Sequence, residues 1–218
     1  MSDLIVLSPC FYKDSSPADL MVKSARHYGL KTYLYGINQP FIPHGADAQV
    51  LKLWELMNYE KLADYVLVTD CRDVLFLAGE REILGKFTSK VGRGILMSTE
   101  NGCWPPDPEI VQFFQGFYVN AGQYIGTWEE VKAALRVLLD KYRDAPDRTG
   151  PDNSQGWWMW AYMRKEIDFD IDVDREVFYS MSGGMDLHFD RHHPCSVHFN
   201  GNPGNDGPQQ EMYRRLFG

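Results

Sequence analysis

The first 70 residues alternate between two hydrophobic patterns, and this alternation constrains the fold more than any other feature of the chain. Three short apolar runs, at residues 3–8, 31–35 and 65–69, have the length and composition of buried strands. Between them lie two segments with helical signals, at 16–28 and 48–59. A βαβαβ order implies a parallel sheet with right-handed crossovers. The sequence therefore predicts an α/β fold whose ligands bind beyond the carboxyl ends of the strands.

The rest of the chain continues this alternation. We expect strands at 94–98 and 196–199, short strands near Ile171 and Phe178, and helices at 80–89, 129–142, 154–165 and the C-terminus. Residues 101–109 are predicted to form a loop, and residues 117–126 a strand, a turn and a second strand. Because no internal repeat or linker divides the chain, the prediction is one domain over residues 1–218, with a mostly parallel sheet flanked by helices.

Charge and composition exclude several classes of protein. The net charge of −8 disfavours a general nucleic-acid binder, which usually carries a basic face. The longest apolar runs are too short to span a membrane, and the N-terminus lacks the basic region of a signal peptide. The four cysteines are widely spaced without a CxxC pair. We therefore expect reduced thiols and a cytoplasmic location.

Two carboxylates come directly after the third predicted strand, in the segment Asp70-Cys71-Arg72-Asp73. Three residues apart at a strand end, both side chains can converge on one cation, and Mg²⁺ and Mn²⁺ prefer oxygen ligands of this kind. The alternative is a turn in which Asp73 caps the backbone and Asp70 pairs with Arg72. On spacing alone this turn is the commoner arrangement, because aspartate is frequent in turns.

A histidine and several glycines follow the last predicted strand, in the segment His198 to Gly204 (HFNGNPG). An imidazole beside carboxylates shifts the metal preference from Mg²⁺ toward Mn²⁺. Glycines allow backbone N–H groups to approach a diphosphate. The alternative is a surface loop with a solvated histidine.

Five short motifs occur in one order along the chain. They are the DxxD after the strand, STENGCWPP (Ser98 to Pro106), YVNAGQYIG (Tyr118 to Gly126), DNSQ (Asp152 to Gln155) and HFNGNPG. This series resembles the glycosyltransferase domain of the multifunctional procollagen lysyl hydroxylases and related collagen-type glycosyltransferases, over about residues 3–204. The resemblance implies a GT-A fold and metal-dependent transfer of a hexose, with UDP-glucose or UDP-galactose as the donor.

The resemblance also implies roles for the matching positions. Asp70, Asp73 and His198 match the ligands of an Mn²⁺ (or Mg²⁺) ion that bridges the two phosphates of the donor. The triplet 120–122 matches a turn that lies against the donor sugar. The positions expected to contact the donor are Thr69, Asp70, Asn120, Ala121, Gly122, Asn200 and Gly201.

Asp152, Gln155 and Glu100 are the candidates for catalysis. Asp152 and Gln155 match a D-x-x-Q element beside the reacting centre, whereas Glu100 and Trp104 match a stretch near the acceptor. The family often has a second acid beside Asp152, where this chain has Asn153. The role of Asp152 is therefore left open between a base, a transient nucleophile and a hydrogen-bond partner of the sugar hydroxyls.

Three further features each have an ordinary alternative. By analogy with glycogenin-like enzymes, Lys52 approaches the donor phosphates, and otherwise it is a solvated helix lysine. The segment 157–160 (WWMW) provides an acceptor platform with at least one exposed tryptophan, or it forms a buried helix face. A polar cluster is expected in a loop over the donor, since its spacing fits no zinc pattern, and its members are His188, Asp190, His192 and His193.

These features together predict a metal-dependent hexosyltransferase that acts on a hydroxyl acceptor. Three alternatives remain: a non-catalytic module that binds nucleotide sugars or glycans, a metal-dependent phosphohydrolase, and a glycosyltransferase that acts on modified DNA bases. A phosphohydrolase would need an aspartyl nucleophile or a two-metal carboxylate set, and the sequence presents neither. The acidic balance makes nucleic acid an unlikely partner, and no membrane association is expected.

Overall fold

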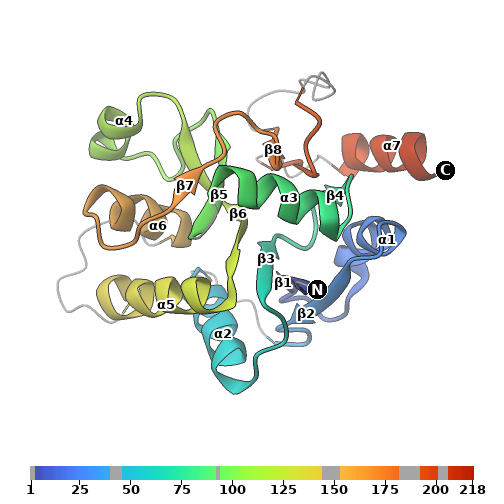
Figure 1. Cartoon of the computed structure of the whole chain (residues 1–218), viewed down its shortest axis with the longest axis horizontal. Helices are drawn as coiled ribbons and strands as arrows, with labels where there is room; N and C mark the ends of the chain where they lie inside the picture. The colour runs from blue at the N-terminus through green and yellow to red at the C-terminus, as the bar shows by residue number, and fades with distance from the viewer. Residues whose placement is uncertain (1–2, 40–45, 92–93, 144–152, 182–191, 201–205) are drawn as a thin grey trace.

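A six-stranded sheet forms the centre of the protein (Figure 1). The computed structural model describes residues 3–39, 46–91, 94–143, 153–181, 192–200 and 206–218. In spatial order the strands are β2 (Lys31–Tyr35), β1 (Leu4–Pro9), β3 (Tyr65–Thr69), β6 (Tyr118–Thr127), β5 (Ile95–Glu100) and β7 (Asp170–Ile171). Strand β6 is antiparallel to both of its neighbours, and the other pairings are parallel. The predicted α/β fold with a mostly parallel sheet is confirmed.

Helices cover both faces of this sheet. The helices of the described residues are α1 (Asp19–His27), preceded by a 3₁₀ turn (Ser16–Ala18), α2 (Ala46–Tyr59), α3 (Glu80–Lys90), α4 (Pro108–Phe114), α5 (Trp128–Leu138), which continues into a π-helical turn (Leu139–Arg143), α6 (Ser154–Met163) and α7 (Asp206–Phe217). On β1, Ile5 and Leu7 pack in one core cluster with α2, α5 and α6, whereas Leu4 and Val6 pack in another with α1 and α3. A strand covered on both faces needs a continuous apolar sequence, which explains the run at the start of the chain.

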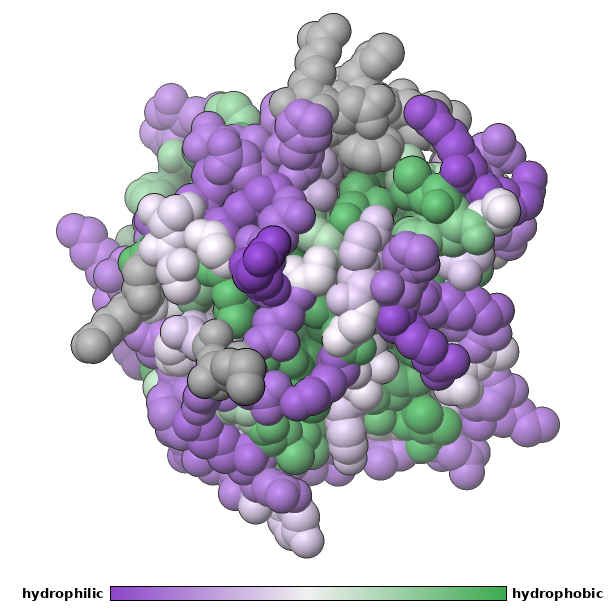
Figure 2. Space-filling view, turned by 45° about the vertical axis from the view of Figure 1, so that its right-hand side comes forward, coloured by the Kyte–Doolittle hydropathy of each residue, from purple (hydrophilic) through white to green (hydrophobic). Residues whose placement is uncertain are grey.

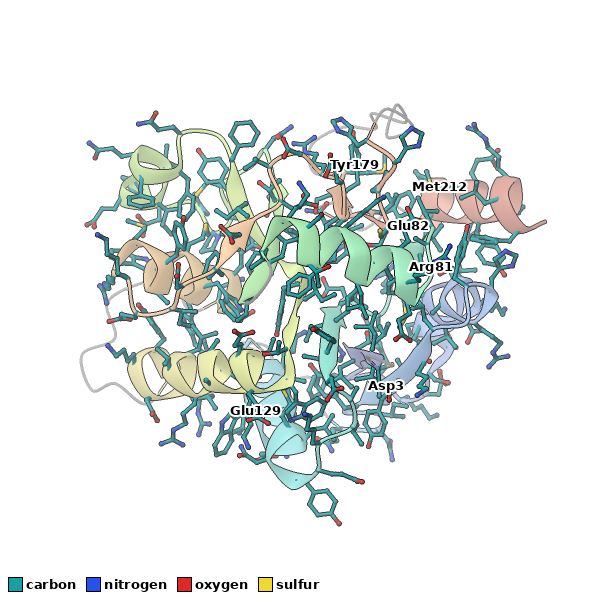
Figure 3. All side chains as sticks on the ribbon, in the orientation of Figure 1. Asp3, Arg81, Glu82, Glu129, Tyr179 and Met212 are labelled. Carbon is teal, nitrogen blue, oxygen red and sulfur yellow. The ribbon has the colours of Figure 1, made fainter. Side chains whose placement is uncertain are left out.

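A second, three-stranded sheet brings the end of the chain to the centre. Its order is β4 (Val74–Phe76), β9 (Ser196–His198) and β8 (Phe178–Ser180), with β9 antiparallel to β4 and parallel to β8. Tyr179 of β8 and Met212 of α7 belong to one buried cluster at this sheet, and both are labelled in Figure 3. The β4–β9 register places His198 opposite Val74, and the Phe199 N–H donates to the Asp73 carbonyl at 2.8 Å.

The structure differs from the sequence prediction at β6, in the central sheet, and at α4. Residues 117–126, predicted as strand, turn and strand, form the single strand β6. Its pairing with β5 jumps from Tyr124 opposite Met97 to Asn120 opposite Ser98, so that residues 121–123 have no partner on β5. An irregularity of this kind re-aims side chains next to a site. Here it turns the Asn120–Gly122 stretch without breaking the strand.

Helix α4 lies within and just after the segment predicted as a loop. Asp107 caps it, since its carboxylate accepts hydrogen bonds from the N–H groups of Glu109 at 2.8 Å and Ile110 at 3.2 Å. Pro108 follows at the first helical position, where proline is well tolerated. The helix therefore begins on ordinary capping chemistry.

The face of the molecule shown in Figure 2 is mostly hydrophilic, with hydrophobic residues showing between the polar ones in smaller areas. Among the described residues, no helix has the length and apolar character needed to cross a membrane.

Candidate active site

The loop from Asp70 to Asp73 connects β3 to β4 and is held at both ends by backbone hydrogen bonds. The Asp70 N–H donates to the Gly122 carbonyl at 2.8 Å, and the Asp73 carbonyl accepts from Phe199. Between the two acids, the Cys71 side chain is buried in the core cluster of the α1–α3 face. The loop is therefore anchored to β6, to the chain after β9 and to the core.

Asp70, Asp73 and His198 converge on one point. Their ligand atoms lie within 4.8 Å of one another, and among the described residues this is the group of three that fits a metal ion. The His198 Nε2 atom is 3.4 Å from Asp70 Oδ2 and 3.4 Å from Asp73 Oδ1. It is also a buried atom with no hydrogen-bond partner. A buried, unpaired nitrogen facing two carboxylates fits a divalent cation with oxygen and imidazole ligands.

The electrostatics of this triad favour positive charge. Burial lowers the pKa of His198, but the charges of Asp73 and Asp70 outweigh burial and raise it to about 10. Burial raises the pKa of Asp73, but the charge of His198 holds it below its ordinary value. In the absence of a metal, an imidazolium therefore balances the two carboxylates. A metal that binds His198 must displace this proton, so that metal affinity depends on pH.

Asn120 orients the histidine. Its amide oxygen lies 3.1 Å from His198 Nδ1 and accepts from the Gly122 N–H at 3.0 Å. An Nδ1–H donated to this oxygen leaves Nε2 free to bind a metal, which is the usual arrangement behind a ligating histidine. The sequence predicted that Asn120 contacts the nucleotide-sugar donor. It did not predict the hydrogen bond between Asn120 and His198.

Gly122 lies against His198 and Asp70 of the triad. A Cβ added to it would lie 2.3 Å from His198 Cε1 and 2.7 Å from Asp70 Oδ2. No side chain fits at these distances, so the close approach of β6 to the triad requires a glycine. The sequence predicted that this residue contacts the donor sugar, and the structure places it beside the candidate metal ligands.

A second polar network lies next to the triad and joins the predicted catalytic residues. Glu100 is 5% exposed and accepts hydrogen bonds from Gln155 Nε2 and from Asn200 Nδ2, both at 2.6 Å. Gln155 Nε2 also donates to the Trp104 carbonyl at 2.7 Å, and its amide oxygen accepts from the Ala121 N–H at 3.0 Å. The structure thus brings Glu100, Gln155, Asn200 and Ala121 together, as predicted for one site.

This network changes the properties of Glu100. Burial raises the pKa of its carboxyl group, although the hydrogen bonds from Gln155, Asn120 and Asn200 oppose the shift. Asn153 caps α6 through its side-chain oxygen, which accepts a hydrogen bond from the Gln155 N–H at 2.8 Å. It therefore helps to hold Gln155 in place.

A cavity of about 430 Å³ opens beside the triad. Its lining residues are Pro9, Phe11, Tyr12, Gln49, Asp70, Cys71, Arg72 and Asp73. A smaller, separate cavity of about 30 Å³ shares Pro9, Gln49 and Asp70 with it, and buried Thr69, Ala121 and Ser154 also line it. The predicted site lies at the carboxyl ends of β1 and β3, as expected. The sequence reasoning missed Tyr12, Gln49 and the cavity position of Arg72, although Arg72 lies inside the motif that it had singled out.

Several residues that the sequence singled out lie away from the cavities or outside the described residues. Lys52 pairs with Glu55 at 2.8 Å on α2 and lines neither cavity. In the segment 157–160, Trp157 and Trp158 are buried, and Trp160 packs under the Arg164 guanidinium at 4.4 Å. The buried-face alternative therefore holds for this segment, because α6 is covered by the sheet and its neighbouring helices. Asp152, Gly201, His188 and Asp190 lie outside the described residues.

Exposed aromatic surface is found instead at Trp104, which is 61% exposed. From the predicted polar cluster, His192 and His193 are described. The His192 Nδ1 lies 3.0 Å from the Asp174 carbonyl, and the His193 carbonyl accepts a hydrogen bond from Lys86 Nζ at 2.5 Å. These contacts hold the segment at the surface, and neither histidine is among the described residues that could hold a metal.

Comparison with known proteins agrees with this geometry. The family model described as the PLOD GT domain matches residues 13–195. No curated protein matches the chain. Among solved structures, the chain is similar to a glycosyltransferase involved in the glycosylation of the major capsid of PBCV-1, with a TM-score of 0.62 and 14% sequence identity, over 98% of this chain and 100% of that chain. At this identity the structural similarity shows the fold, and the family model covers most of the chain. The chain belongs to the PLOD GT domain family and is a glycosyltransferase domain of the GT-A type.

Proposed function

We propose that this glycosyltransferase uses a divalent metal, Mn²⁺ or Mg²⁺, to transfer glucose or galactose from a UDP-sugar to a hydroxyl acceptor. The observation that carries the proposal is the buried, unpaired Nε2 of His198, which faces the carboxylates of Asp70 and Asp73 at the edge of a cavity of about 430 Å³. A cavity of this size suits a small-molecule ligand.

The chain's own residues would hold the metal and the donor in fixed positions. Asp70, Asp73 and His198 supply two oxygens and one nitrogen, and Asn120 fixes the orientation of the imidazole. When bound, a divalent ion supplies the positive charge that makes the nucleoside diphosphate a better leaving group. The Asn200 amide oxygen, buried and unpaired, is a further group proposed to contact the donor.

Glu100, Gln155 and Asp152 remain the proposed catalytic residues. Glu100 fits a base that takes the acceptor proton, because its raised pKa makes it a stronger base than an exposed carboxylate. Gln155 links Glu100 to the Trp104 carbonyl, and the exposed Trp104 ring supports an acceptor that approaches from this side. Asp152 immediately precedes the cap of α6, close in sequence to Gln155.

The proposal is tested by donor binding and turnover. Wild-type protein with Mn²⁺ and a panel of UDP-sugars should show a thermal shift and release UDP, and Asp73→Asn should lose the Mn²⁺-dependent part of both effects. Asp168→Asn, at an exposed position outside the site, is the matched control and should behave as wild type. A wild-type protein that neither binds nor hydrolyses any UDP-sugar would refute the proposed UDP-sugar donor. Metal-dependent donor binding without turnover towards any hydroxyl acceptor would favour the binding-module alternative.

A further inference from the structure

The charges around the main cavity leave one side chain without a role in the proposed mechanism. Asp70 and Asp73 line the cavity, and Arg72, which stands between them in the sequence, lines it as well. Within the described part of the chain, Arg72 alone among the lining residues carries a positive charge. The exposed Arg72 guanidinium therefore lines the same cavity as the two carboxylates proposed to bind the metal, and the question is what it binds there.

The geometry of the loop separates Arg72 from the metal ligands. Cys71 is buried and fixes the loop to the core, while Asp70 and Asp73 turn toward His198. The Arg72 side chain is exposed and reaches the Tyr12 hydroxyl, where its charge and hydrogen bond partly offset the rise in the Tyr12 pKa that burial causes. Arg72 therefore lies on the cavity side of the loop, next to the metal triad and outside it.

The charge balance of the triad explains what such a group can do. Two carboxylates neutralise a divalent ion held with one neutral imidazole, so that the metal centre alone has about zero net charge. A nucleoside diphosphate carries more than one negative charge, and these charges need a further cation. Lys52, the candidate from the sequence, is paired with Glu55 and does not line the cavity.

We propose that Arg72 binds the diphosphate of the nucleotide-sugar donor and stays with the nucleoside diphosphate as it leaves. A guanidinium is suited to this role because its planar, paired N–H donors match phosphate oxygens. Arg72 is thereby a further donor-binding residue, within the motif but distinct from its metal ligands. The inference rests on the proposed function, since it assumes a nucleotide-sugar donor in this cavity.

The test is the binding of UDP by calorimetry to the whole chain, with Mn²⁺ and with EDTA. Removing the charge in Arg72→Gln should weaken UDP binding roughly tenfold in Mn²⁺, and Arg72→Lys should recover part of the loss. The affinity of the variant should also fall less steeply with added KCl, because one screened charge pair is missing. Arg81→Gln, at an exposed position on α3 (Figure 3), removes the same charge outside the cavity and should leave UDP affinity unchanged.

Two results would overturn the inference. One is a UDP affinity of Arg72→Gln within twofold of wild type. The other is a weakened affinity whose dependence on KCl equals that of wild type, which would assign Arg72 to the uncharged base or ribose. If wild-type protein bound no UDP with or without Mn²⁺, the proposed function itself would fail. If wild-type protein bound UDP and Arg72→Gln bound it equally well, this inference alone would fail. Because Arg72 is exposed, the variants should fold, and thermal unfolding in EDTA verifies this.

Discussion

Replacing Gly122 by alanine should remove metal binding while the fold remains. The added Cβ would stand 2.3 Å from His198 Cε1, and ordinary contact begins at 3.4 Å, so the imidazole must move by about 1.1 Å. Metal–ligand distances tolerate only about 0.2 Å, so a displaced Nε2 no longer binds with Asp70 and Asp73. We expect Mn²⁺ affinity to fall by about 100-fold or more, beyond the upper end of what loss of a supporting hydrogen bond costs.

The backbone gives no other reason for such a loss. The φ angle of Gly122 lies outside the left-handed region, so alanine is strained there only by contact. Crowding of this kind costs stability of about 1–3 kcal/mol, which thermal unfolding in EDTA would measure. Gly85 on α3, whose Cβ would meet nothing within 4 Å, is the matched control. Gly85→Ala should keep Mn²⁺ affinity and stabilise the helix by roughly 0.5–1 kcal/mol.

The assay is a Mn²⁺ titration followed by calorimetry and by the electron paramagnetic resonance of free Mn²⁺. Wild-type affinity in Gly122→Ala would refute the assignment of the triad as the metal site. Loss of affinity in both glycine variants would show that the effect comes from general destabilisation and not from the contact with His198.

Three further predictions follow from the same contacts. Binding of Mn²⁺ near pH 7.5 should release about one proton, because the raised pKa of His198 keeps the imidazole protonated without metal. Calorimetry in buffers of different ionisation enthalpy counts the released protons, and no release would contradict this protonation state. In EDTA, the stability that protonated His198 contributes should be fully present below its ordinary pKa of 6.5 and be lost as the pH rises toward about 10. The free energies of unfolding of wild type and His198→Gln, measured in urea, should therefore converge toward high pH. Asn153→Ala should lower the unfolding free energy by about 1 kcal/mol through loss of the α6 cap, and an unchanged melting temperature would mean that the cap is not needed.

Local patterns along the chain were sufficient to predict the central fold. The apolar runs of β1 and β3 are continuous because both faces of these strands are buried, and this pattern survives in any α/β context. Asp70 comes directly after β3. The rule that ligands bind at the carboxyl ends of strands then assigns it to a ligand site. The grouping of Asp70, Asp73 and His198 came from the family resemblance, since no local pattern relates positions more than a hundred residues apart.

What the sequence could not predict depends on tertiary packing. The face of α2 that meets the cavity was undetermined, and the structure directs Gln49 there while Lys52 pairs along the helix. Whether the tryptophans of α6 are buried or exposed depends on how many sides of that helix are covered by other elements. The irregular pairing of β6 lies where Gly122 closely approaches Asp70 and His198, and this approach exists only in the assembled structure.

The antiparallel pairing of β4 with β9 has a consequence for folding and turnover. It makes two proposed ligands of one ion neighbours, although they stand at positions 73 and 198, so a bound ion would act as a cross-link that closes a loop of about 125 residues. Such a link removes freedom mainly from the unfolded chain, and its binding energy adds to the stability of the folded one. The last fifth of the chain, with β9 and α7, should then exchange amide hydrogens and yield to proteases faster without metal than with it. Metal supply would in this way determine how long the protein survives as well as whether it can react.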